Sequence, residues 1–173
     1  MKLAHALLAG AALAVSLANS AQAADLLPAD PIYSSPLFNF EGLYLGATGG
    51  GALNSGALSG TVGMVVGSNF AITDGIIAGV EFQGDAYWNS GGFTSYDALA
   101  LGRVGGFITD NAMAYGELGA GFATGGPVYA FGAGVEMAMT DQLAVRGELQ
   151  GLGNFGAMPS TAKATVGLIF HVN

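Results

Sequence analysis

The residues in this sequence that could take part in chemistry are mainly carboxylates, with a few bases and one histidine in the body of the chain. The sequence has no cysteine, and its two histidines are His5 and His171. A Ser–His nucleophilic pair would therefore have to use His171, which follows the last apolar stretch. No His-rich or Cys/His metal spacing occurs, and the glycine run 49–51 lacks the Lys and Ser/Thr of a phosphate loop. We therefore expect no catalytic residues, no metal site, no cofactor and no enzymatic activity.

The carboxylates belong partly to a segment that occurs three times. Each copy reads apolar-Thr-Asp-x, with a Glu seven residues after the Asp, and the Asp residues are 36 and 31 positions apart. This spacing suits one hairpin per repeat, made of two strands of about ten residues and two connections. Thr-Asp followed by Gly, Asn or Gln is typical of a turn. The residues of these predicted turns are Thr73, Asp74, Thr109, Asp110, Thr140 and Asp141.

The three turns divide the chain into eight predicted strands. The expected strands are 43–53, 59–70, 75–88, 93–108, 112–124, 127–139, 143–153 and 161–172. We predict an all-β fold, an eight-stranded antiparallel transmembrane β-barrel of up-and-down topology. An even number of strands leaves both chain ends on one side, where the short Thr-Asp turns would be periplasmic. The other four connections would face outwards, and they are unusually brief for outer loops.

Period-two alternation brings the charged residues of the predicted strands onto one face. The opposite face carries no charge, as expected beside lipid, where an Arg or Lys at the bilayer centre costs about 2–4 kcal/mol. A soluble β-sandwich would instead need many more charged side chains on its solvent face. The alternation is weaker in 93–108, where Leu99 and Leu101 also point inwards. The residues predicted to form a charge network in the lumen are Glu81, Asp85, Asp97, Arg103, Glu117, Glu136, Arg146, Glu148 and Lys163.

Two interpretations of this interior follow from its six acids and three bases. One is an ion-pair network that plugs the lumen, because eight strands leave room only for side chains. The other is a narrow, cation-preferring passage, because a ring of acids favours cations. Glycine at many inward positions predicts more free space than usual and keeps the second interpretation open.

The N-terminus has the features of a secretory signal peptide. A basic start with Lys2 precedes an apolar run of about 12 residues, and Ala21-Gln22-Ala23 provides a small-residue cleavage site. The run is shorter than the roughly 20 residues that a membrane-spanning helix needs. We therefore expect a cleaved signal peptide at 1–23, a periplasmic linker at 24–41 and an outer-membrane barrel at 42–173.

Composition agrees with this assignment. Beyond residue 23 there are only three basic residues against twelve acidic ones, which argues against binding to nucleic acid. Charged residues make up 9% of the chain, against about 25% in a usual soluble domain. Thirty glycines are too many for helices, since each interior Gly costs up to about 1 kcal/mol relative to Ala.

The start of the mature chain resembles a known family. Ala24-Asp25-Leu26-Leu27-Pro28 is followed by a Pro-containing linker and then by Phe40-Glu41-Gly42-Leu43-Tyr44-Leu45-Gly46. This order resembles the small outer-membrane β-barrels ("porin family") of alphaproteobacteria, within the broader OmpA-like barrels. Phe40 stands where that family has Trp, and the chain ends in Phe170-His171-Val172-Asn173 rather than on a terminal Phe.

The resemblance and the residues together set the functional expectations. They predict location in the bacterial outer membrane, contact with its lipids and lipopolysaccharide, and insertion by the barrel assembly machinery. The expected role is structural, in envelope integrity, with a small cation-preferring pore as one alternative. A surface adhesin or receptor is a third possibility, although such binding usually resides in long loops.

Overall fold

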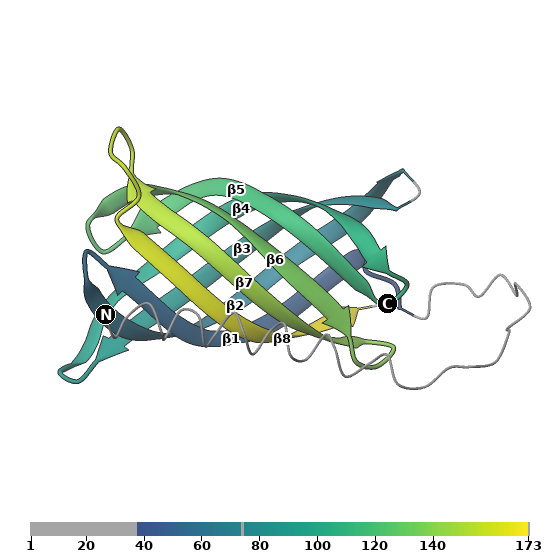
Figure 1. Cartoon of the computed structure of the whole chain (residues 1–173), viewed down its shortest axis with the longest axis horizontal. Coiled ribbons are helices and arrows are strands. Elements are labelled where there is room, and N and C mark those ends of the chain that lie inside the picture. The colour runs from purple at the N-terminus through teal and green to yellow at the C-terminus, as the bar shows by residue number, and fades with distance from the viewer. Residues whose placement is uncertain (1–37, 74, 173) are drawn as a thin grey trace, which may run out of the picture. The chain divides into compact units, whose positions relative to one another are not determined.

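The structure is a computed structural model, and it describes residues 38–73 and 75–172. The predicted signal peptide, most of the predicted linker, the turn residue Asp74 and the last residue lie outside the described residues. Eight antiparallel strands form a closed ring in chain order, and β1 pairs with β8 to close it (Figure 1). The strands are β1 (Gly42–Asn54), β2 (Ala57–Thr73), β3 (Ile76–Asn89), β4 (Gly92–Thr109), β5 (Ala112–Ala123), β6 (Gly126–Ala138), β7 (Leu143–Asn154) and β8 (Thr161–Val172).

The predicted fold class is confirmed, and each strand begins and ends within a few residues of its predicted bounds. The largest difference is in β2, which continues to Thr73 instead of ending near residue 70. The described residues include no helix that is long and apolar enough to cross a membrane. The strands hold all nine residues of the predicted charge network.

The start of β1, the end of β8 and the three Thr-containing turns lie at one end of the barrel, here called the terminal end (Figure 1). In the turn between β6 and β7 the hydroxyl of Thr140 accepts hydrogen bonds from the backbone amides of Gln142 and Leu143. In the turn between β4 and β5 the Thr109 hydroxyl donates to the side-chain oxygen of Asn111, 2.8 Å away. The threonine of the repeat therefore makes side-chain hydrogen bonds within two of these turns.

The opposite, distal end holds four short connections, at 55–56, 90–91, 124–125 and 155–160. The first is a two-residue hairpin in which Ser55 and Gly56 both have positive φ, 46° and 94°. Two successive positive φ values define a type I′ turn, whose twist matches that of the flanking strands. A tight turn of this kind sets the register of β1 against β2 directly.

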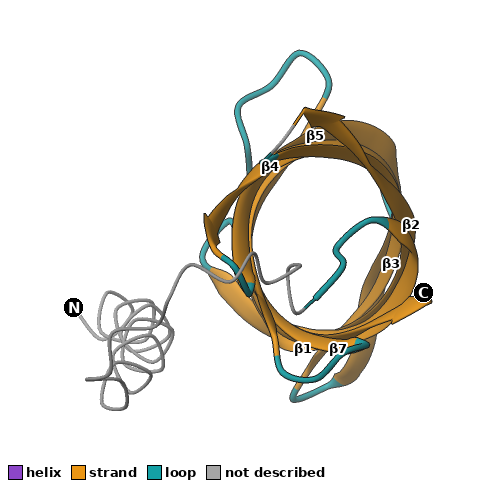
Figure 2. Cartoon of the chain, turned by 90° about the vertical axis from the view of Figure 1, so that its right-hand side faces the viewer, coloured by secondary structure: helices purple, strands orange, loops and turns teal. Residues whose placement is uncertain are grey.

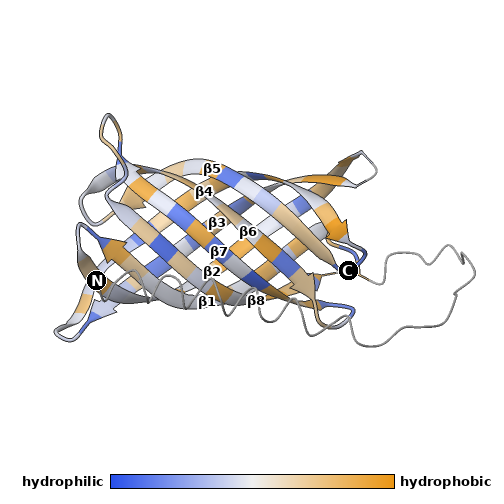
Figure 3. Cartoon of the chain, viewed as in Figure 1, coloured by the Kyte–Doolittle hydropathy of each residue, from blue (hydrophilic) through white to orange (hydrophobic). Residues whose placement is uncertain are grey.

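The two faces of the barrel wall differ sharply in polarity, and Figure 3 shows polar and apolar residues alternating along the strands. Large apolar side chains such as Met64, Phe82, Leu118 and Leu149 are at least 60% exposed on the outside. Every charged residue within the eight described strands is buried on the inside. The wall therefore has the apolar outer face and polar inner face of a membrane-spanning barrel.

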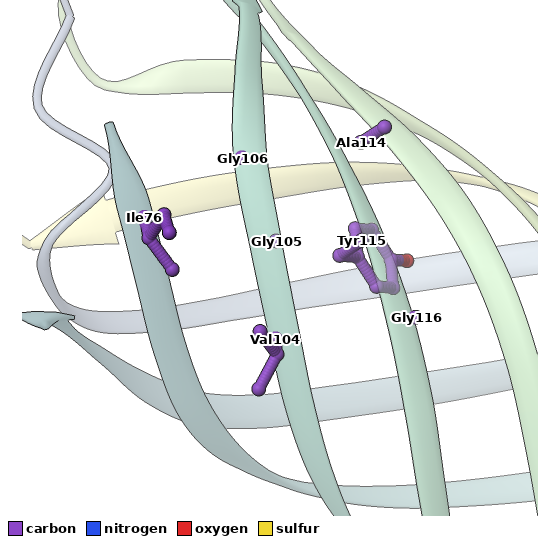
Figure 4. A pocket seen from close by; sticks show the side chains of 7 residues that line it. All are labelled: Ile76, Val104, Gly105, Gly106, Ala114, Tyr115 and Gly116. Atoms are coloured by element: carbon purple, nitrogen blue, oxygen red, sulfur yellow. The ribbon is translucent and has the colours of Figure 1, made fainter. Parts of the chain in front are cut away.

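The outer wall has a shallow hollow of about 420 Å³ near the terminal end of β3, β4 and β5 (Figure 4). Glycines at 105, 106 and 116 form much of its surface, beside Ile76 and Val104. Its lining has no charged side chain, and it lies on the apolar outer face, so we assign no site to it.

Candidate functional site

The structure places all nine residues of the predicted charge network inside the barrel, each 6% exposed or less. It separates them into two groups at different heights. The central cluster contains Glu81, Arg103, Glu117, Glu136, Arg146 and Glu148, and the distal group contains Asp85, Asp97 and Lys163.

Arg146 is the residue that joins most of the central cluster. Its Nη1 lies 2.7 Å from Glu81 Oε2, while its Nε and Nη2 lie 3.1 Å and 3.0 Å from Glu136 Oε2. The same Nη1 is 3.9 Å from Glu148 Oε2. Because β7 carries Arg146 while β3 and β6 carry Glu81 and Glu136, one guanidinium bridges distant parts of the ring.

Arg103 of β4 reaches the same two carboxylates from the other side. Its Nη1 donates to Glu81 Oε2 at 3.1 Å, and its Nη2 lies 3.4 Å from Glu136 Oε2. Its guanidinium carbon is 3.8 Å from the centre of the Tyr115 ring, which fits a cation–π contact. The two arginines and two glutamates thus form a shared, fully buried ion-pair network.

Two tyrosines extend this network, and the sequence did not predict them. The hydroxyl of Tyr44 donates to Glu81 Oε2, and the hydroxyl of Tyr115 donates to Glu148 Oε2, both at 2.6 Å. Both tyrosines lie on inward positions of strands, so alternation alone could have placed them in the lumen. Their glutamate partners lie two strands away around the ring, at a distance that only the closed barrel defines.

A glycine lies between each tyrosine and its glutamate. Tyr44 of β1 is opposite Gly67 of β2, and Gly67 is opposite Glu81 of β3. The same order recurs four strands later, in Tyr115 of β5, Gly134 of β6 and Glu148 of β7. Each tyrosine side chain therefore extends over a glycine to reach a carboxylate, and the two halves of the barrel repeat this arrangement.

The inward glycines consequently do not leave the open space that the sequence suggested. A Cβ added at Gly67 would overlap the Tyr44 ring, and one at Gly134 would overlap the Tyr115 ring. Likewise, a Cβ at Gly63 would overlap the Asp85 carboxylate. The expectation of a sparsely filled lumen is wrong at these positions, because the missing side chains make room for large neighbours.

This packing predicts a position-specific effect of alanine. Gly134→Ala should destabilise the barrel by roughly 1–3 kcal/mol, because its methyl group displaces the Tyr115 ring from Glu148. Gly147→Ala in the next strand is the matched control, since a Cβ there meets no atom within 4 Å. The measurement is urea unfolding in lipid vesicles, and equal stability losses for both variants would contradict this account of the glycine.

A pair of glutamines links the two halves across the lumen. Gln150 Nε2 donates to Gln83 Oε1 at 2.8 Å and to Glu117 Oε1 at 2.6 Å. One carboxylate oxygen from each of Glu81, Glu117 and Glu148 lies within 4.8 Å of the other two. Oxygen ligands of this kind suit hard cations, but the guanidinium of Arg146 already contacts two of these carboxylates, at 2.7 Å and 3.9 Å.

The distal group contains one ion pair and one further acid. Lys163 Nζ lies 2.6 Å from Asp85 Oδ2, and the Tyr87 hydroxyl donates to Asp97 Oδ2. Leu99 and Leu101, which weakened the alternation of the predicted fourth strand, are buried in the lumen as expected. Their packing partners form an apolar cluster with them: Val128, Ala130 and Leu152.

His171 has a different environment from the one the sequence suggested. In the sequence it lies near the end of the predicted strand 161–172, and it is not among the residues of the predicted charge network. The structure shows it fully buried, with Nε2 2.6 Å from Glu136 Oε1, so it belongs to the central cluster. Its inward position in β8 follows the same alternation as Thr165 and Ile169, and that signal could have identified it.

Phe38 and Phe40, here called the aromatic pair, cover this histidine at the terminal end. Both are buried, at 2% and 1% exposed, with their ring centres 4.6 Å apart. Their rings lie 4.9 Å and 5.8 Å from the His171 ring, and Asn69 Nδ2 donates to the carbonyl of Phe40 at 2.9 Å. The loop before β1 therefore turns into the ring of strands (Figure 2), although these residues belong to the predicted linker.

No protein-family model and no curated protein matches this chain. Among solved structures, it is similar to Neisserial surface protein A, with a TM-score of 0.50, 15% identity, and coverage of 75% of this chain and 96% of that one. It is similar to Ail, the attachment invasion locus protein of Yersinia pestis, with a TM-score of 0.50, 15% identity, and coverage of 75% and 97%. At this identity the likeness shows the fold alone, which is that of the small, eight-stranded, outer-membrane type of β-barrel.

Proposed function

We propose that this protein is a closed barrel of the bacterial outer membrane, with a structural role in the envelope and a lumen that carries little or no current. The observation that carries this proposal is the buried network of Arg103 and Arg146 with Glu81 and Glu136. Its side chains reach from β3, β4, β6 and β7 to common atoms, so they occupy the middle of the lumen. Moving them aside would leave buried charges without partners, which costs several kcal/mol.

The aromatic pair supports the same proposal at the terminal end. Phe38 and Phe40 pack against His171, which is itself bonded to Glu136. An ion entering from this end would first have to displace two buried aromatic rings. The lumen is thus obstructed at two successive levels.

The proposed location and partners of the protein are supported by the outer face of the barrel rather than by its lumen. The charge-free outer face supports contact with outer-membrane lipids and lipopolysaccharide, and the export signal predicted at 1–23 supports delivery by the barrel assembly machinery. We place the terminal end, with its Thr-containing turns, on the periplasmic side, which is the side predicted for the linker that precedes Phe38. The resemblance to alphaproteobacterial, OmpA-like barrels supports a non-enzymatic protein of this kind.

The cation-preferring passage is the second candidate, and one observation favours it. The lumen holds six carboxylates against Arg103, Arg146 and Lys163, so acids exceed permanent cations in number. An acidic interior attracts cations wherever it admits water. The adhesin interpretation has less support, because three of the four distal connections are only two residues long.

A planar-bilayer recording of the folded barrel tests the proposed closure. We expect no stepwise current from the wild type, and none from a Phe38→Ala/Phe40→Ala variant, because the central network still fills the lumen. A variant that combines Arg103→Ala and Arg146→Ala with Phe38→Ala and Phe40→Ala removes both obstructions and should produce stepwise, cation-selective current, since its remaining lumen charges are mostly carboxylates. Wild-type currents that select for cations and fall on Glu117→Gln would contradict closure and establish the passage.

A further inference from the structure

A cavity of about 540 Å³ lies at the distal end of the barrel, away from the central cluster. All eight strands contribute to it, and its volume is within the range of small-molecule sites, about 300–1,000 Å³. The envelope role proposed above makes no use of this cavity. Its polar lining consists of amide and hydroxyl side chains, among them Tyr87, Asn89, Ser95 and Thr161, around one carboxylate, that of Asp97.

The cavity wall has an acidic side and an apolar side. Asp97 and Tyr87 come from β4 and β3, whereas Val128 and Leu152 come from β6 and β7. Val128 and Leu152 are 6% and 5% exposed and belong to the apolar cluster beneath the cavity. A ligand that fits both sides would have a polar head and a short apolar body.

The Asp97 carboxylate is the group that selects the charge of that head. It is 3% exposed, Tyr87 donates to its Oδ2, and its Oδ1 has no hydrogen-bond partner among the described residues. The nearby base, Lys163, is bonded at 2.6 Å to Asp85, the register partner of Asp97. Lys163 is therefore paired with Asp85, and no ion pair to Asp97 is present among the described residues. A buried carboxylate needs a donor or a cation to offset its lost hydration.

We propose that this cavity binds a small organic cation, a primary ammonium group attached to a short apolar body. The ammonium pairs with the Asp97 carboxylate, in a charge-assisted hydrogen bond. The apolar body packs against Val128 and Leu152. This proposal does not depend on whether the lumen conducts, because the cavity lies on the distal side of the central network.

Benzylamine and its neutral analogue benzyl alcohol test the proposal, because they have similar shape and differ in charge. Backbone amide NMR shifts of the folded barrel in lipid nanodiscs would report binding at Ser95 and Thr161, which line the cavity. We expect saturable shifts with benzylamine and about tenfold weaker binding of benzyl alcohol. Asp97→Asn, which still accepts from Tyr87, should weaken benzylamine about tenfold and leave benzyl alcohol unchanged. Asp141→Asn, in an exposed turn at the terminal end, should change neither.

A second variant tests the apolar side independently. Val128→Phe fills that side of the cavity and should weaken both probes, while heat-modifiable gel migration confirms that the barrel is folded. Equal affinities of the two probes for the wild type, or an unchanged benzylamine affinity in Asp97→Asn, would overturn the proposal. Saturable shifts with calcium chloride but not with benzylamine would also overturn it, in favour of a metal ion.

Discussion

Arg146→Met is expected to lower the free energy of unfolding by about 3–5 kcal/mol, the usual cost of removing one member of a buried ion-pair network. The guanidinium of Arg146 contacts Glu81 and Glu136 at 3.1 Å or less and lies 3.9 Å from Glu148. Among the described residues, its removal leaves Arg103 as the only permanent cation bonded to Glu81 and Glu136. Met fills similar space without charge, so the loss reports the uncompensated carboxylates rather than a cavity.

Urea unfolding in lipid vesicles, followed by fluorescence of the sole tryptophan, Trp88, measures this loss. Lys163→Met is the matched control, because Lys163 is equally buried but has one carboxylate partner, Asp85. It should lose less stability than Arg146→Met. Arg146→Lys should fall between wild type and Arg146→Met, since an ammonium group cannot present several donors in a planar fork. A loss below about 1 kcal/mol for Arg146→Met would contradict the central role of this residue.

Leu149→Arg is expected to destabilise the inserted barrel by about 2–4 kcal/mol and to reduce the yield of folded protein. Leu149 lies in the middle of β7, is 60% exposed, and points away from the lumen. In a membrane this position faces lipid, which cannot hydrate the guanidinium. Val80 and Val135, which occupy equivalent outward positions, should respond in the same way.

A control for Leu149→Arg needs a position where the structure leaves room for an arginine outside the membrane-facing wall. Arg at the inward Gly79 or Gly134 would not serve, because even a Cβ there overlaps neighbouring atoms. Met158→Arg is suitable, since Met158 is 85% exposed in the 155–160 connection, and it should change stability by no more than about 1 kcal/mol. Heat-modifiable gel migration gives the folded fraction. Equal folded yields and equal unfolding curves for Leu149→Arg and Met158→Arg would show that the outer face is not in lipid.

Much of the fold could be predicted because its signals are local. The Thr-Asp turns divide the chain into segments of suitable length, and a strand has a strict two-residue period, so each charged side chain marks its own face. Even the two inward leucines of β4, which seemed to break the pattern, have a place in the apolar cluster with Val128 and Leu152. The inward positions of the nine charged residues followed from the same period.

The contacts inside the lumen could not be predicted in this way. Glu81 meets Tyr44 from two strands away and Arg146 from four strands away, so both contacts depend on ring closure and on the register of every intervening pair. The role of glycine was misread for the same reason. A missing side chain looks like space in a sequence, whereas in the barrel a tyrosine from the neighbouring strand fills it.

By itself, the sequence determined the number of strands, their direction and which side chains face inwards, because turn chemistry and period-two alternation act between residues close in the chain. Only the tertiary structure decided that Phe38 and Phe40 pack against His171 at the terminal end, that two arginines share two glutamates, and that a cavity with Asp97 remains at the distal end. These features arise from side chains that meet across a lumen, and their meeting depends on barrel width and strand register. Those quantities exist only once the eighth strand has paired with the first.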